Sequence, residues 1–282
     1  MNAQVMSGKT VLITGANSGI GKIAAGALAG MGASVILACR RGDAAREAMK
    51  EIRLSHPEAE LEFLELDLAS LKKVRAAAQE FLSRHQKLDV LINNAGLANV
   101  RRETTVDGYE MTFAVNHLGP FLFTELLLPA LRKAHGRVIN VASDAHRIGK
   151  MHWQDLHFHS GYFVMRAYAQ SKLANILFTR ELSRREEAHG VTVHALHPGA
   201  VATNIWPEAK WYEKLFSRFI KLFMISPEQG ARTSIWLASN AIGGNSTGGY
   251  FEKCREKQPS KAARDDAAAQ RLWKISEELT HD

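Results

Sequence analysis

The stretch TVLITGANSGIG at residues 10–21 decides the fold of this chain. Its first half, TVLIT, is a run of β-branched and apolar residues that predicts a buried strand. The second half carries Gly15, Gly19 and Gly21, and a helical apolar pattern starts at Ile23. Glycines at a strand-to-helix turn let the backbone approach a pyrophosphate, which the free N–H groups and dipole of the helix N-terminus then stabilise. The first turn of the chain therefore predicts a dinucleotide site.

Strands and helices alternate along the rest of the chain. We expect strands at residues 34–39, 61–66, 90–92, 138–141 and 191–196, and helices at about 43–55 and 71–85. Helices alternating with apolar strands are typical of a parallel sheet covered on both faces. No repeat and no linker rich in Pro, Gly and Ser divides the sequence. We therefore predict an α/β protein with a single doubly wound Rossmann-type domain over residues 1–282, with ligands bound beyond the carboxyl ends of the strands.

Charge and composition narrow the class of protein. The net charge is +7, but the basic residues are scattered and no recognised nucleic-acid motif accompanies them. A general preference for anions, such as a phosphorylated cofactor or a membrane surface, explains this balance. We expect no nucleic-acid partner. His152, His157 and His159 lie near Asp155, yet none of them has the helix-borne HExxH spacing, so we expect no metal site.

The termini and the cysteines suggest where the protein works. The first predicted strand begins within about ten residues, which leaves no room for a signal peptide or a spanning helix. Cys39 and Cys254 are the two cysteines, too few for a disulfide framework or a structural zinc site. We expect a reducing, cytoplasmic setting.

Tyr168 and Lys172 form the first candidate for chemistry. In a helix, residues four apart share one face, so a phenol and an ammonium would share one site. A tyrosine has an ordinary pKa of about 10, and a nearby cation favours its phenolate. The pair is a candidate acid/base device for moving a proton on or off an oxygen. Because many surface helices carry the same spacing without a role, the neighbouring motifs decide its meaning.

Those motifs occur in a recognisable order. The glycine turn is followed by Asn93-Asn94-Ala95-Gly96, by Ser143 after a strand, by the Tyr168 and Lys172 pair, and by Pro198-Gly199. From about Lys9 to Tyr250 the chain resembles the short-chain dehydrogenase/reductase family. The resemblance implies hydride transfer between a nicotinamide cofactor and an alcohol/carbonyl pair. A nucleotide-binding regulatory or scaffold protein that retains the fold is the alternative.

The resemblance also assigns roles to the candidate catalytic residues. Tyr168 would protonate the carbonyl oxygen during reduction or take the hydroxyl proton during oxidation, and Lys172 would lower the pKa of Tyr168 and hold the nicotinamide ribose. Ser143 would hydrogen-bond the substrate oxygen. Asn116 matches the family's asparagine that supports a proton relay through water. The alternative interpretation is an asparagine in a helix interior that satisfies backbone groups, and both interpretations can hold together.

The cofactor site follows in the same way. The residues implied by the resemblance are Gly15, Asn17, Ser18, Gly19, Ile20, Gly21, Arg40, Arg41, Asp67, Leu68, Asn94, Ala95, Gly96, Tyr168, Lys172, Pro198, Gly199, Val201 and Thr203. An NAD-selective site places an acid at the end of the second strand, whereas a 2′-phosphate needs cations. This chain has Arg40 and Arg41 there and no acid before Asp43. NADP(H) is therefore predicted in preference to NAD(H).

Finer matches point to one branch of the family. Ala38-Cys39-Arg40, Val115-Asn116-His117-Leu118-Gly119 and His197-Pro198-Gly199 resemble the retinol dehydrogenase-like members, which implies a small apolar carbonyl or alcohol as the substrate. Pro120 stands where a histidine is frequent. In the family, the region at about 204–226 is a substrate lid, and bulky apolar residues crowd it here. A subunit interface in a homo-oligomer and peripheral contact with a membrane are the alternatives for this segment.

Overall fold

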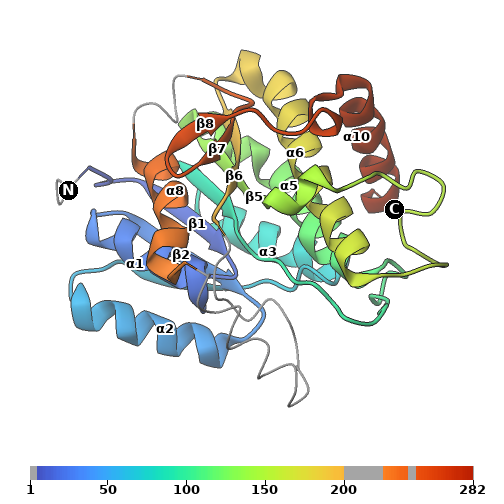
Figure 1. Ribbon diagram of the computed structural model, residues 1–282. Coiled ribbons are helices and arrows are strands. Elements are labelled where there is room, and N and C mark those ends of the chain that lie inside the picture. Colours follow the sequence, from blue (N-terminus) through green and yellow to red (C-terminus); the bar gives the residue numbers. More distant parts are fainter. Residues whose placement is uncertain (1–4, 200–224, 241–245, 282) are drawn as a thin grey trace.

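A mostly parallel, eight-stranded sheet forms the centre of the molecule (Figure 1). The computed structural model describes residues 5–199, 225–240 and 246–281. The strands are β1 (Thr10–Thr14), β2 (Ser34–Cys39), β3 (Leu61–Glu65), β4 (Val90–Asn93), β5 (Arg137–Val141), β6 (Thr192–His197), β7 (Tyr250–Glu252) and β8 (Arg255–Lys257). Their order is β3-β2-β1-β4-β5-β6-β7-β8, and every neighbouring pair is parallel except β7 and β8. The predicted α/β class and doubly wound sheet are confirmed.

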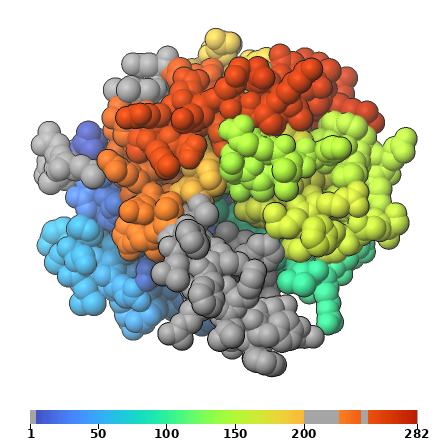
Figure 2. Space-filling view, in the orientation of Figure 1, coloured from blue at the N-terminus to red at the C-terminus, as the bar shows by residue number. Residues whose placement is uncertain are grey.

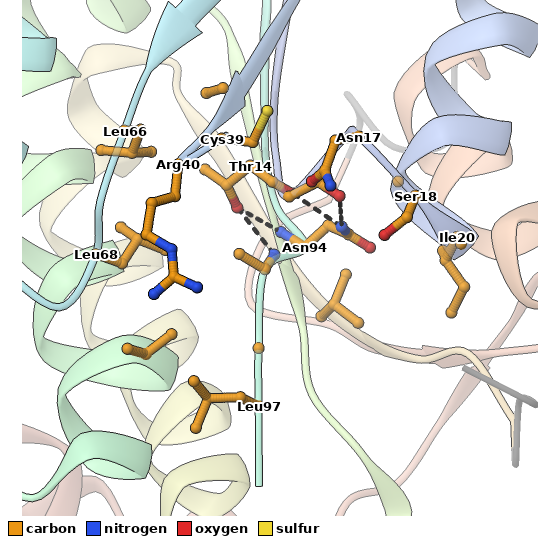
Figure 3. A pocket seen from close by; sticks show the side chains of 18 of the residues that line it. Thr14, Asn17, Ser18, Ile20, Cys39, Arg40, Leu66, Leu68, Asn94 and Leu97 are labelled. Carbon is orange, nitrogen blue, oxygen red and sulfur yellow. Dashed lines mark hydrogen bonds between the residues drawn. The ribbon is translucent and has the colours of Figure 1, made fainter. Parts of the chain in front are cut away.

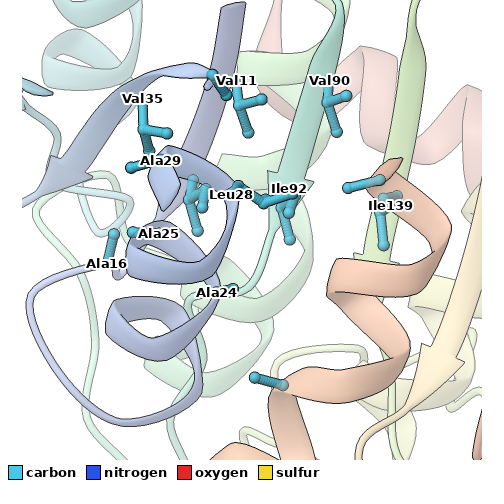
Figure 4. Close-up of a cluster of buried hydrophobic side chains, with 14 of the residues drawn as sticks. Val11, Ala16, Ala24, Ala25, Leu28, Ala29, Val35, Val90, Ile92 and Ile139 are labelled. Atoms are coloured by element: carbon cyan, nitrogen blue, oxygen red, sulfur yellow. The ribbon is translucent and has the colours of Figure 1, made fainter. Parts of the chain in front are cut away.

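Helices cover both faces of the sheet because successive strand residues point to opposite sides. On one side, Val11 and Ile13 of β1 pack against α1 (Gly19–Gly30), α2 (Gly42–Ser55) and α8 (Pro227–Ser239), and Figure 4 shows the part of this core around Leu28. On the other side, Leu12 joins a core built from α3 (Leu71–Arg84), α5 (Gly119–Ala134), α6 (Val164–Glu186) and α10 (Asp266–Thr280). Helices α1 and α8, far apart in sequence, pack against each other (Figure 1). The blue N-terminal and orange C-terminal parts of the chain accordingly meet on the face shown in Figure 2.

One edge of the sheet ends in a tight hairpin that the sequence did not predict. Strands β7 and β8 pair antiparallel, and the two residues between them, Lys253 and Cys254, have φ angles of 50° and 58°. Two consecutive left-handed residues are the geometry of a type I′ turn, which normally uses Asn or Gly. Neither residue gives that signal, so the hairpin has no recognisable sequence pattern.

A long apolar helical run lies in the core next to the cleft. Helix α4 (Met111–Phe113), the π-helical turn η1 (Ala114–Leu118) and α5 follow one another without a break. The combined Met111–Ala134 run has the length and mean hydropathy of a membrane span, but 78% of its most apolar window is buried inside the protein. It is therefore a core helix. The Glu110 carboxylate caps its start by accepting hydrogen bonds from the N–H groups of Thr112 and Phe113.

Candidate active site

A cleft of about 490 Å³ lies at the carboxyl ends of the parallel strands. Its walls include the turn after β1, the end of β2 and the residues that follow β3 and β4 (Figure 3). The end of β5 and Tyr168 and Lys172 of α6 complete the lining. Most of the residues predicted to bind the cofactor line it: Gly15, Asn17, Ser18, Gly19, Ile20, Gly21, Arg40, Asp67, Leu68, Asn94, Ala95, Gly96, Tyr168, Lys172 and Pro198. Residues from distant parts of the sequence thus form one site at the carboxyl ends of the strands, where the sequence predicts it.

The glycine turn has the backbone geometry that a phosphate site needs. Gly15 and Gly19 have φ angles of +67° and +53°, which side-chain-bearing residues rarely adopt. A Cβ on Gly21 would lie 2.5 Å from the Asn94 amide nitrogen and 2.6 Å from the Gly15 oxygen. Ser18 stands at the N-cap of α1, but its hydroxyl makes no capping bond. The Ser18 side chain therefore leaves the N–H groups of the first turn of α1 uncapped, and such N–H groups can bind an anion.

Thr14 ties this turn to the next one, and the motif search did not single it out. Its hydroxyl oxygen accepts hydrogen bonds from the N–H groups of Asn94 and Ala95, each at 3.0 Å. The Asn94 amide in turn donates to the Thr14 carbonyl at 2.8 Å (Figure 3). Asn94 is therefore fixed by the end of β1. The only sequence signal for Thr14 is its place immediately before the first glycine.

The two arginines after β2 behave differently. Arg40 lines the cleft, projects toward Leu68 (Figure 3) and makes no hydrogen bond or ion pair with any residue that the structure describes. Arg41 lies outside the lining and pairs with Asp43, with 2.9 Å between Nη2 and Oδ2. That interaction lowers the pKa of the Asp43 carboxyl to about 2. Only Arg40 thus presents its guanidinium to the cleft.

Tyr168 and Lys172 line the cleft, whereas Ser143 is not part of its lining and is connected to the cleft through Tyr168. Helix α6 places the Lys172 Nζ 5.6 Å from the centre of the Tyr168 ring, as the four-residue spacing predicts. The Lys172 ammonium is buried and donates to the Val141 carbonyl at 2.9 Å. Ser143 follows β5, caps the 3-10 turn η2 (Asp144–Arg147) and hydrogen-bonds with Tyr168.

Burial, rather than the lysine, governs the acidity of this tyrosine. Removal from water raises the pKa of Tyr168, and the hydrogen bond with Ser143 opposes that rise only in part. Burial also lowers the pKa of Lys172 to about 8. The predicted lowering of the Tyr168 pKa by Lys172 stays a prediction; in this structure the ammonium donates to the Val141 carbonyl, and burial is the largest influence on the Tyr168 pKa.

Asn116 is held by the loop after β4. Its Oδ1 accepts from the N–H of Leu97 and its Nδ2 donates to the Leu97 carbonyl, both at 2.8 Å, while Nδ2 also donates to the Ser171 hydroxyl at 3.0 Å. The side chain thus satisfies backbone groups, as the second interpretation of this asparagine expected. Asn116 still lies close to the site, because a Cβ on Gly96 would be 3.3 Å from both the Asn116 Oδ1 and the Lys172 Nζ.

The remaining predicted residues lie at the other wall or outside the described part of the chain. Pro198 lines the cleft, and Gly199 next to it has a φ of +99°. Val201, Thr203 and residues 204–224 of the predicted lid lie outside the described residues. Of the histidines near Asp155, His157 accepts the N–H of Glu110, and His159 contacts Arg102.

Comparison with known proteins defines the class. A family model described as short chain dehydrogenase matches residues 9–213, so the chain belongs to this family. It is 44% identical to retinol dehydrogenase 14 of Homo sapiens over 290 residues, which cover 97% of this chain and 86% of that protein. It is 44% identical to retinol dehydrogenase 12 of Mus musculus over 284 residues, covering 99% of this chain and 88% of that protein.

Solved structures agree. An uncharacterized protein from Mycobacterium paratuberculosis superposes with a TM-score of 0.80 at 36% identity, covering 98% of this chain and 94% of that chain. An NADP complex of RhlG from Pseudomonas aeruginosa shares the fold, with a TM-score of 0.70 at 24% identity over 89% of this chain and 97% of that one. The resemblance to the retinol dehydrogenase-like branch is confirmed. Membership of the family implies an oxidoreductase that uses a nicotinamide dinucleotide and interconverts alcohols and carbonyls.

Proposed function

We propose that this chain is an NADP(H)-dependent oxidoreductase that interconverts an apolar alcohol and its aldehyde or ketone, with Tyr168 as the acid/base. The observation that carries the proposal is that Tyr168, which hydrogen-bonds with Ser143, and the buried Lys172 line the same cleft as the glycine turn. A scaffold that only bound a nucleotide would have no need for an ammonium buried beside a phenol, because burying a charge destabilises a fold.

The cleft fits a dinucleotide. The glycine turn and the start of α1 would hold the pyrophosphate, and the region of Asp67 and Leu68 would hold the adenine. At the other end, Lys172 and Pro198 would flank the nicotinamide ribose and ring. When bound, the nicotinamide supplies or accepts the hydride.

The protein's own residues move and hold the proton. In the reducing direction, the Tyr168 hydroxyl donates its proton to the carbonyl oxygen as that oxygen gains negative charge. Ser143 holds the same oxygen with a hydrogen bond. The Tyr168 phenol is protonated at neutral pH and so holds the proton that the acid role needs, although its raised pKa makes it a weaker donor. In the oxidising direction, the charged form of Lys172 would stabilise the phenolate that accepts the hydroxyl proton.

Selectivity for the phosphorylated cofactor rests on Arg40. Its guanidinium projects into the cleft at the end of β2 with no ion pair among the described residues, whereas Arg41 is engaged with Asp43. A planar, permanently charged fork is well suited to a 2′-phosphate. The acid in the described cleft lining, Asp67, follows β3, and β2 itself is followed by Arg40 and Arg41.

The preference for an apolar substrate rests on the relatives, which include retinol dehydrogenases 12 and 14. We also propose the segment at 204–226 as the substrate lid, from the sequence alone.

The test is a steady-state assay with a homologous series of straight-chain aldehydes and both reduced cofactors, followed by nicotinamide absorbance. We expect turnover, and we expect a higher kcat/KM with NADPH than with NADH. The kcat/KM should also rise with chain length, with a gain in transition-state binding free energy of up to about 0.8 kcal/mol for each additional buried methylene. Binding of NADPH without turnover of any carbonyl or alcohol would favour the regulatory or scaffold alternative.

The lid has its own test. Trp211 is one of the bulky apolar residues in the sequence of this segment. Trp211→Ala should weaken the dependence on chain length while leaving turnover of the shortest aldehyde largely unchanged. Tight, salt-sensitive binding to anionic vesicles, with no effect of chain length, would support the membrane alternative instead.

A further inference from the structure

Two histidines hold opposite ends of the peptide bond that joins Ser143 to Asp144. The Ser143 carbonyl oxygen lies 2.7 Å from the Nδ1 of His146, in the turn η2. The N–H of Asp144 donates to the Nδ1 of His197, the last residue of β6, at 3.2 Å. Both polar groups of a single peptide unit are therefore bonded to imidazoles that come from different elements of the fold.

The partners assign a different tautomer to each ring. A carbonyl can only accept, so the Nδ1 of His146 carries a proton and its Nε2 accepts the N–H of Ser260 at 3.1 Å. A backbone N–H can only donate, so the Nδ1 of His197 is unprotonated and its proton is on Nε2. Each ring would lose one of these bonds on becoming an imidazolium: His146 the bond to Ser260, and His197 the bond to Asp144.

The surroundings keep both rings neutral at pH 7. His146 is fully buried with its ring edge-on to Tyr250, and burial lowers its pKa against the opposing bond to Ser143. Burial also lowers the pKa of His197. The charged groups near them act in both directions: Asp144 raises the pKa of both, Glu252 raises that of His197, and Arg147 lowers both.

The held peptide belongs to the catalytic serine. Ser143 hydrogen-bonds with Tyr168, and its position depends on the same backbone that the two rings hold. His197 directly precedes Pro198, which lines the cleft, and Ser260 leads into the turn η5 (Ala262–Arg264), which packs on α6. The two rings thus connect Ser143 to β6 on one side and to the C-terminal part of the chain on the other.

We propose that His146 and His197 are positioning residues that fix the peptide bond after Ser143 and so direct the Ser143 hydroxyl toward Tyr168 and the substrate oxygen. The proposal rests on the proposed function for its catalytic consequence. Its geometric part stands without it, because the tautomers can be observed in the protein at rest.

The first test is ¹⁵N NMR of the full chain with labelled histidines at pH 7.5. We expect His146 to carry its proton on Nδ1 and His197 to carry its proton on Nε2, with the signals assigned from the spectra of the His146→Asn and His197→Asn variants. The same tautomer for both rings, or the reverse assignment, would overturn the proposal whatever the enzyme does.

The second test uses paired substitutions. The side-chain amide of Asn places a donor or acceptor close to where Nδ1 lies, so His146→Asn can still donate to the Ser143 carbonyl and His197→Asn can still accept from Asp144. His146→Leu and His197→Leu cannot. We expect each Leu variant to lower kcat by about tenfold to a hundredfold, as small misplacements of catalytic groups do, with NADPH affinity unchanged. The Asn variants should recover most of the loss.

The pH profile separates this role from general support of the fold. Protonation of His197 breaks its bond to Asp144, so wild-type kcat should fall on the acid side, and His197→Asn, whose amide does not titrate, should retain more activity there. His281→Asn, at an exposed histidine beyond α10, serves as the matched control. Equal losses in the Leu and Asn variants, or wild-type kcat in the Leu variants, would refute the proposal.

Two further outcomes remain interpretable. If a Leu variant fails to fold, the tautomers of the wild-type histidines and the pH profile of His197→Asn still test the positioning role of the two histidines. If the wild type turns over no substrate while the tautomers are as expected, the proposed function fails and the geometry stands.

Discussion

Replacing Lys172 with methionine should make the protein more stable and catalytically inactive. The Lys172 side chain is 3% exposed, and within the described part of the chain its ammonium has one hydrogen bond, to the Val141 carbonyl. Burial lowers its pKa from 10.5 to about 8. Methionine has nearly the same length and carries no charge, so Lys172→Met removes the burial of an ammonium without leaving a large cavity.

The pKa sets the size and the sign of the effect. Below pH 8 the lowered pKa of Lys172 corresponds to roughly 3 kcal/mol that disfavours the folded state, at about 1.4 kcal/mol for each pH unit. Loss of the hydrogen bond to Val141 costs about 1 kcal/mol. At pH 7, Lys172→Met should therefore raise the free energy of unfolding by about 2 kcal/mol. Between pH 8 and pH 10.5 the unfolded wild type binds more protons than the folded one, so wild-type stability rises and the advantage of the variant disappears.

Urea unfolding of both proteins at pH 7 and at pH 10.5 measures this difference. Lys274→Met, at an exposed lysine of α10, is the matched control and should change the free energy of unfolding by less than about 0.5 kcal/mol. A Lys172→Met protein that is less stable than wild type at pH 7, or a difference that does not depend on pH, would contradict the argument that burial of the ammonium opposes folding.

Three other predictions test cofactor choice and stability. Arg40→Asp should lower the ratio of kcat/KM for NADPH to that for NADH by about tenfold to a hundredfold, because a charge-assisted bond to the 2′-phosphate is lost; an unchanged ratio would mean that Arg40 does not touch the phosphate. Burial lowers the pKa of His117 to about 3, so the folded state loses stability as pH falls below the ordinary 6.5, by up to about 5 kcal/mol near pH 3. Because glutamine does not titrate, the His117→Gln protein should lose less free energy of unfolding than wild type between pH 7 and pH 4, as measured by urea unfolding. An equal decrease in the two proteins would contradict the prediction. Arg132→Met removes the arginine that donates two hydrogen bonds to the 2%-exposed Glu186 carboxylate, and it should lower the free energy of unfolding by about 2 kcal/mol. In a Glu186→Gln background the same substitution should lower the free energy of unfolding by less. Equal decreases in the two backgrounds would show that the pair is not coupled.

The sequence was sufficient to predict those strands and helices whose local apolar pattern agrees with their burial in the fold. The predicted strand at 34–39 matches β2, and the helix expected at about 71–85 ends one residue earlier, at Arg84. These elements carry unbroken apolar patterns, and their faces are buried as the patterns require. The cleft followed from the same reasoning, because the motifs stand at carboxyl ends of parallel strands, which meet at one edge of the sheet.

Features that depend on tertiary contacts could not be predicted in this way. The hairpin at Lys253 and Cys254 uses left-handed residues without a glycine or asparagine to mark it. Arg41 pairs with Asp43 while Arg40 faces the cleft, and two adjacent arginines look alike in a sequence. The acidity of Tyr168 depends on how far burial outweighs a nearby cation, which only the packed structure reveals.

The roles of the histidines that contact the peptide bond after Ser143 also depend on tertiary contacts and could not be predicted from the sequence. His197 lies 54 residues from Ser143 in the sequence, and nothing in its apolar strand marks its ring as an acceptor. The pairing of β5 with β6 brings the two together at the end of the sheet. Long-range pairing thus supplies the contacts that sequence motifs do not carry.

Turnover by Tyr168→Phe tests the central claim most directly. The substitution removes the proton-transferring oxygen and keeps the ring, so NADPH should bind the purified variant with wild-type affinity. With the best aldehyde of the series, the account predicts that kcat falls by at least about a hundredfold, the contribution typical of general acid–base catalysis. A folded Tyr168→Phe protein that binds NADPH and keeps near wild-type kcat would contradict the assignment of Tyr168 as the acid/base.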